Sequence, residues 1–200
     1  MLMTQRRLLL ATGMAALAAP TMLRAQPRPV IDTIAGLPGF NRFVELVGLA
    51  GLTDYLRGPG PFTVFAPTDA AFNAAPSSTI QAMAGTNAQS GGGQNTGGGG
   101  SNPDNIRLRA FIQYHIITGQ AVLLKELATG DHQLRTENGA AVLVRGAPGQ
   151  VVTVSNPAPG QQAGSFSAPG LNVMPPAPIV TADIPAANGV VQAIGGVLFP

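Results

Sequence analysis

Phe62-Thr63-Val64-Phe65-Ala66-Pro67-Thr68-Asp69-Ala70-Ala71-Phe72 carries the most specific local signals for the fold of this chain. Its opening aromatic and β-branched residues favour a strand. The strand must end at Ala66-Pro67, because proline lacks a backbone N–H and disfavours helix at the residue before it. Thr68 is a good N-cap, and Asp69 places a carboxylate in the first turn of the helix that follows. The stretch therefore predicts a strand, a corner and a capped helix, with Thr68 and Asp69 in structural roles.

The composition excludes several classes of protein. Three arginines (Arg6, Arg7 and Arg24) belong to an N-terminal leader, and without them the chain has eight basic residues against nine acidic ones. Such a balance offers no cluster of positive charge for nucleic acid, so we expect no nucleic-acid partner. The chain has no cysteine, which excludes disulfides, thiol catalysis and thiolate metal sites.

The N-terminus, residues 1–25, predicts a signal peptide. Arg6-Arg7 precede an apolar run from Leu8 to Ala19 that is too short to span a bilayer, and Ala25 suits the last leader residue. Residues 4–9 are typical of a bacterial twin-arginine signal, with an ordinary secretory signal as the alternative. We therefore expect a periplasmic or secreted bacterial protein with no stable membrane anchor after cleavage.

Residues 26–200 predict a single domain of helices and strands. Apolar residues at helical spacing indicate helices beginning near Val30 and Phe40, a short one at Thr53–Leu56 and a longer one at Asn105–Ile117. Shorter apolar runs predict strands, which lie at 134–136, 142–144, 151–155, 179–184 and 190–194. The Gly-rich segment 84–103 and the Pro/Gly-rich segment 156–178 predict irregular surface loops, because neither can bury enough apolar area to offset its ordering entropy.

Three motifs occur in a characteristic order. The first is Thr63-Val64-Phe65-Ala66-Pro67-Thr68-Asp69 with Ala71-Phe72, and the second is Tyr114-His115-Ile116. The third runs through Ala182-Asp183-Ile184 and Asn188-Gly189-Val190-Val191 to Val197-Leu198-Phe199-Pro200. Together they resemble the fasciclin domain, a secreted or surface-attached adhesion module. The resemblance implies an α+β fold: a β-rich wedge of two packed sheets with several helices, in which strands 62–65 and 190–199 pair.

The resemblance also implies binding residues. In animal members a Tyr-His motif flanked by Leu or Ile is linked to integrin recognition, and Tyr114 and His115 match it. Asp183 and Ile184 resemble the Asp-Ile pair that the family associates with cell adhesion. The residues themselves permit another interpretation, because helical spacing buries His115 and an Asp beside a turn commonly caps backbone donors. Both interpretations stay open.

Asn188 and Gly189 belong to the closing motif as structural residues, and the chain departs from the family beside them. Gln192 stands where family members commonly have His, and Gly195-Gly196 where an Asp commonly precedes the last apolar run. Those family residues are thought to fasten the closing strand. Their replacement puts the usual hydrogen bonds of that strand in question.

No motif predicts catalysis or a cofactor. A triad of Asp69, His115 and a serine needs a setting such as Gly-x-Ser-x-Gly, which no serine has. The two histidines and the scattered carboxylates lack the spacing of a metal site. A phosphate-binding loop needs a following Lys and Ser or Thr at fixed spacing, and the Gly-rich segment has no such arrangement.

The sequence thus predicts a non-catalytic exported adhesion or interaction module that binds a protein or polysaccharide surface. The first alternative is a carrier of small apolar ligands, which requires a sizeable cavity between helices and sheets. The second is an envelope hydrolase, which requires His115 exposed in a cleft beside Asp69 or Asp183.

Overall fold

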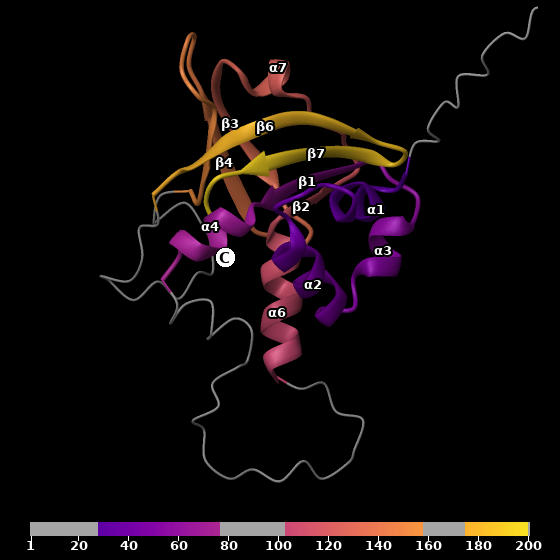
Figure 1. The fold of residues 1–200 in the computed structure, drawn as a ribbon. Helices are drawn as coiled ribbons and strands as arrows, with labels where there is room; N and C mark the ends of the chain where they lie inside the picture. The colour runs from indigo at the N-terminus through magenta and orange to yellow at the C-terminus, as the bar shows by residue number, and fades with distance from the viewer. Residues whose placement is uncertain (1–27, 77–102, 158–174, 200) are drawn as a thin grey trace, which may run out of the picture.

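The structure, a computed structural model, describes residues 28–76, 103–157 and 175–199. In this part of the chain, short helices gather against a strongly curved β-sheet (Figure 1). The predicted leader (1–25) lies outside the described residues, as do 84–102 of the predicted Gly-rich loop and 158–174 of the Pro/Gly-rich loop.

The strands form one mixed sheet in the order β2-β1-β7-β6-β5-β4-β3. Their bounds are β1 Phe62–Pro67, β2 Ile116–Thr118, β3 Gly130–Arg135, β4 Ala141–Gly146, β5 Thr153–Ser155, β6 Ala177–Ala186 and β7 Gly189–Ile194. β1 and β7 are parallel, and the other neighbours are antiparallel. The two ends of the sheet nearly meet, since Glu137 N–H, just after β3, donates to Ile116 O of β2 (2.8 Å). A single sheet nearly closed into a barrel thus stands where the sequence predicted two packed sheets.

Most of the described helices cover one side of the sheet (Figure 1). They are α1 Val30–Ala35, α2 Asn41–Leu49, α3 Thr53–Arg57, α4 Asp69–Ala74 and α6 Pro103–Tyr114, whereas α7 Leu124–Leu127 packs near β3 and β4. The predicted helix Asn105–Ile117 is too long. It ends at Tyr114 because Ile116–Thr118 pairs with β1, in the register Thr63↔Ile117, and β-branched side chains suit that strand.

The predicted pairing of the first and last motifs is confirmed, with Thr63 opposite Val190 and Phe65 opposite Gln192. The closing strand ends at Ile194, as the apolar run 190–194 predicted, and not at Phe199, as the resemblance implied. Beyond it, Gly195 N–H donates to Pro178 O (2.8 Å), and the chain turns toward α6.

Every residue of β1 is buried, since its two faces lie in two hydrophobic cores. Val64 and Ala66 pack with the helices, in the core that contains Phe43 and Leu108. Phe65 faces the barrel interior, in the core that contains Val144 and Tyr114. Burial of one large apolar side chain stabilises the fold by roughly 1.5–3 kcal/mol. Because its side chains enter both cores, this six-residue strand contributes such burial to each of them.

Candidate functional site

The corner after β1 is built by two side chains. Thr68 caps α4, because its hydroxyl accepts a hydrogen bond from Ala71 N–H (3.2 Å). Asp69 holds a different helix: its carboxylate accepts from the backbone N–H groups of Asn41 (3.3 Å) and Arg42 (2.9 Å), at the start of α2. The acidic residue therefore links the corner to the N-terminal helices, and both of its carboxylate oxygens are engaged.

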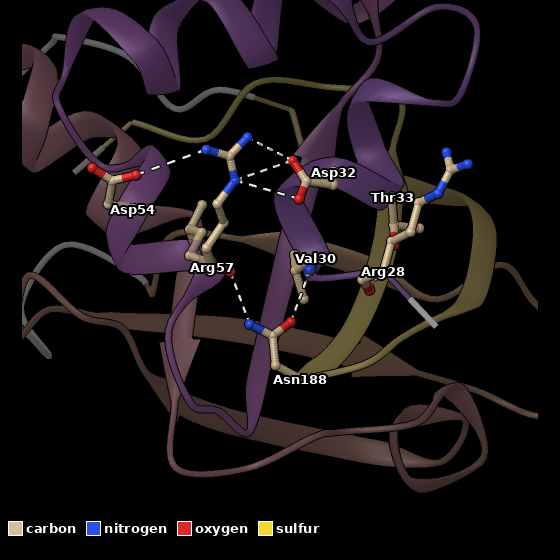
Figure 2. A network of polar contacts seen from close by, with 8 residues as sticks. Arg28, Val30, Asp32, Thr33, Asp54, Arg57 and Asn188 are labelled. Atoms are coloured by element: carbon tan, nitrogen blue, oxygen red, sulfur yellow. Dashed lines mark hydrogen bonds and ion pairs between the residues drawn. The ribbon is translucent and has the colours of Figure 1, made fainter. Parts of the chain in front are cut away.

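Asn188 connects the turn before β7 to the N-terminal helices (Figure 2). Its amide nitrogen donates to Leu56 O (2.8 Å) and Gly58 O (2.7 Å), and its Oδ1 accepts from Val30 N–H (2.8 Å). Its own carbonyl accepts from Phe62 N–H (2.9 Å). One side chain thus provides hydrogen-bond partners for a backbone N–H at the start of α1 and for two backbone carbonyls at the end of α3.

Gly189 follows Asn188 at a position where the backbones of β7 and β1 come close together. A Cβ at this position would lie 2.1 Å from Phe62 O, a distance that no side chain can accept without a backbone shift. The glycine is therefore required by the parallel pairing itself.

His115 lies in the core with no exposed surface. Its Nδ1 is 2.9 Å from Phe111 O, and its Nε2 accepts from Leu198 N–H (3.2 Å), so the neutral ring carries its proton on Nδ1. The Phe111 ring packs against it at 4.8 Å between centroids. Burial lowers the pKa of His115 to about 4, with the Phe111 carbonyl opposing the shift. The imidazole thereby fastens the C-terminal segment to α6.

Tyr114 is also fully buried, and it points into the barrel. Its hydroxyl donates to Asn156 Oδ1 (2.8 Å) and lies 3.0 Å from Ala141 O. Burial raises the pKa of Tyr114 well above its ordinary value. Asn156 also donates to Phe199 O, so Tyr114, like its neighbour, supports the C-terminal segment.

Asp183 and Gln192 form a second polar network. Gln192, buried inside the barrel, accepts from Asp183 N–H (3.0 Å) and donates to Asp183 Oδ1 (2.8 Å) and Val122 O (3.1 Å). Asp183 Oδ1 also accepts from Leu124 N–H (2.8 Å), at the start of α7. Gln192 thus joins β7 to Asp183 of β6 and to the backbone at Val122, since its amide both donates and accepts.

The four residues predicted to bind a partner do not form one site. Tyr114 and His115 lie in the core, whereas Asp183 is exposed and Ile184 is half-buried against the helical core. Asp183 has a left-handed backbone, with φ of 55°, which its hydrogen bonds to Leu124 and Gln192 hold in place. Their role in binding stays a prediction.

A shallow cavity of about 330 Å³ lies elsewhere, beside α3. Its lining comes from α3, the following turn, the start of β1 and the end of β2: Asp54, Tyr55, Gly58, Pro59, Gly60, Pro61, Phe62, Thr118 and Gly119. Sequence reasoning did not single out this site. The available signal was Tyr55, one of two tyrosines in the chain, placed just before Gly58-Pro59-Gly60-Pro61.

The described residues offer no metal centre. Among residues 28–76, 103–157 and 175–199, no group of three or more His, Cys, Asp or Glu could hold a metal ion. Within the same ranges, every buried side-chain nitrogen or oxygen has a hydrogen-bond partner. The described helices also include none that is long and apolar enough to cross a membrane.

A family model and several known proteins are similar to this chain over most of its length. A family model described as the Fasciclin domain matches residues 38–200. Protein sll1483 of Synechocystis sp. is 25% identical, over 86% of this chain and 73% of its own length. Stabilin-1 of Mus musculus is 26% identical, over 86% of this chain but 5% of its own length. Transforming growth factor-beta-induced protein ig-h3 of Sus scrofa is 28% identical, over 90% of this chain and 20% of its own length.

A solved structure shares the fold. It is a FAS1 domain pair from the insect cell adhesion molecule fasciclin I, with a TM-score of 0.51 and 21% identity. The match covers 80% of this chain and 45% of that chain.

Proposed function

The chain belongs to the fasciclin domain family, and from this membership we propose that it is a non-catalytic, exported module that binds a protein or polysaccharide surface. The match over residues 38–200 carries the proposal, since it includes all the described strands. Fasciclin I is a cell adhesion molecule, and the domain also occurs in stabilin-1 and protein ig-h3. Because a fold alone does not define a function, the local geometry must agree with this role.

That geometry supports binding rather than catalysis. Both ring nitrogens of His115 are engaged in a fully buried position, so the ring has no free group to exchange a proton with a substrate. Asp69 is committed to the start of α2, and Asp183 to Leu124 and Gln192. A general acid or base must be free to exchange a proton at the reacting atoms, whereas each of these three side chains makes structural hydrogen bonds.

Within this proposal, Asp183 and Ile184 contribute to the contact surface directly. Asp183 is exposed and conformationally fixed, which limits the entropy that binding costs. Tyr114 and His115 act from the core, by holding residues 198 and 199 against α6 and the barrel.

The proposed setting is the periplasm or exterior of a bacterium, reached through a twin-arginine signal in residues 1–25. Arg6→Lys together with Arg7→Lys should then retain the precursor in the cytoplasm, as seen by fractionation. Export that persists after this change would point to the ordinary secretory route instead.

The experiment that tests binding is capture from envelope extract with the purified chain immobilised. We expect recovery of an envelope protein, or retention of a cell-wall polysaccharide, that a matched bead without the chain does not retain. Asp183→Asn keeps a polar group for Leu124 N–H while removing the charge, so it should weaken a contact that uses the carboxylate. If neither protein nor polysaccharide is retained at low or moderate salt, the proposal is wrong.

A further inference from the structure

The cavity beside α3 has an aromatic wall that is held in place. The Tyr55 ring packs against Phe62, with centroids 5.5 Å apart, and remains 38% exposed. Behind the cavity, Thr118 Oγ1 donates to Glu137 Oε2 (2.8 Å). The pKa of Tyr55 is raised above its ordinary value by partial burial first and then by the Glu137 carboxylate. The half-exposed ring of Tyr55 thus packs against Phe62, and Thr118 joins the cavity lining to Glu137.

The charged groups at the cavity are one carboxylate in its described lining and one arginine just outside it. Asp54 is the one charged residue of its described lining, and the Asp54 side chain is fully exposed. The nearest base, Arg57, lies 3.8 Å from Asp54 but donates at 2.9 Å to Asp32 (Figure 2). Asp54 therefore keeps free acceptor capacity, and the described lining contains no Lys, Arg or His.

The size of the cavity favours part of a larger partner over an enclosed small molecule. Small-molecule pockets extend from roughly 300 to 1,000 Å³ and bury most of their ligand. This one, at about 330 Å³, is shallow and has mainly apolar walls of Tyr, Pro and Phe. Such a site suits a single long side chain whose stem is apolar and whose tip is polar.

We propose that this cavity receives an arginine side chain of a partner protein. The planar guanidinium stacks on the exposed face of Tyr55, and its N–H groups donate to the Asp54 carboxylate. Glu137, which accepts a hydrogen bond from Thr118 of the lining, adds a second carboxylate near the cavity. This inference rests on the proposed function as an interaction module, and it assigns that module a protein partner with an exposed arginine.

The test is a titration of the purified, isotope-labelled chain with N-acetyl-arginine amide, followed by NMR. We expect amide shifts to concentrate at residues 54–62 and 118–119 and to weaken as salt is added. N-acetyl-citrulline amide has the same shape without the charge, and it should produce much smaller shifts. Equal shifts with citrulline, or none with arginine, would overturn the proposal.

Variants locate the site. Asp54→Asn should raise the dissociation constant of the arginine probe about two- to fivefold, because an exposed ion pair is lost. Tyr55→Leu should raise it by a similar factor, about two- to fivefold, because the cation–π contact is lost. Glu45→Gln removes an exposed carboxylate on α2, outside the cavity lining, and should leave the dissociation constant unchanged. If Glu45→Gln weakens binding as much as Asp54→Asn, the effect is one of net charge and the pocket is not the site.

The titration needs no cellular partner, so it decides the arginine pocket separately from the proposed function. If envelope partners are captured equally well by the wild type, Asp54→Asn and Tyr55→Leu, the chain remains an interaction module but this pocket is not its contact. If a neutral oligosaccharide shifts the amide signals of the same residues, the occupant of the cavity is a sugar and not arginine.

Discussion

The buried ring of His115 makes the stability of the protein depend on pH. Its pKa is lowered from 6.5 to about 4 by burial, so the unfolded chain takes up a proton at a higher pH than the folded chain. The contribution to stability is fully present above pH 6.5 and is lost as the pH falls toward 4. A protonated ring could no longer accept from Leu198 N–H, which removes the link between α6 and the C-terminal segment.

The size of the effect follows from the two pKa values. One pKa unit corresponds to about 1.4 kcal/mol, so the limiting loss is roughly 3 kcal/mol in strong acid. Between about pH 7.5 and about pH 5, the free energy of unfolding should fall by about 2 kcal/mol. Arg145 hydrogen-bonds Asp131 and holds the pKa of Asp131 below its ordinary value of 3.8, so that pair loses its contribution only in more acidic solution.

The assay is urea unfolding at several pH values in this window, followed by circular dichroism, since the chain has no tryptophan to report by fluorescence. His115→Gln removes the titrating ring and should be less stable at neutral pH but nearly independent of pH across the window. His132→Gln, the matched change at the other histidine, should keep the wild-type dependence. If the wild type loses less than about 0.5 kcal/mol, or if His115→Gln shows the same loss, the titration of His115 does not control the pH dependence of stability.

Three further predictions concern side chains whose hydrogen bonds stabilise the fold. Asn188→Ala should lower the free energy of unfolding by roughly 3 kcal/mol, because three backbone groups lose their partner, and a change under about 1 kcal/mol in urea unfolding would contradict this. Thr68→Ala should cost about 1 kcal/mol in the same assay, as the loss of an N-cap, whereas Thr68→Ser should restore most of it. Gln192→Leu should cost roughly 2 kcal/mol in urea unfolding, because Val122 O and Asp183 N–H lose their partner. Gln192→His should cost less, since an imidazole can donate and accept a hydrogen bond. Equal losses in the two variants would show that packing alone matters at this position.

The strand, corner and helix around Thr68 could be predicted from the sequence because their determinants are local. The N-cap bond joins residues only three positions apart, and the proline ends the strand by its own covalent geometry. Asp69 could be identified as a structural carboxylate, but the helix it serves could not. It binds the start of α2, 27 to 28 positions earlier in the chain, which only the packing of α4 beside α2 brings within reach.

Elements whose ends depend on a distant partner were predicted less well. Residues 115–117 continue the apolar pattern of α6, yet Ile116 and Ile117 form a strand because they pair with β1. The closing of seven strands into one curved sheet depends on contacts such as that of Glu137 with Ile116, which no local pattern specifies. The same holds for Gln192: the sequence marked it as a departure from the family pattern, and only the structure showed that its amide bonds Asp183 and Val122.

The corner at residues 62–72 could be predicted from neighbouring residues, and the order of three motifs identified the family. The resemblance to that family implied the pairing of the first and last motifs, which the structure confirms. The tertiary structure was needed to show that His115 is a fully enclosed, neutral ring and that the half-exposed Tyr55 ring packs against Phe62 near the end of β2. Burial and the convergence of side chains from α3, β1 and β2 are properties of the packed chain, since each depends on residues far apart in sequence.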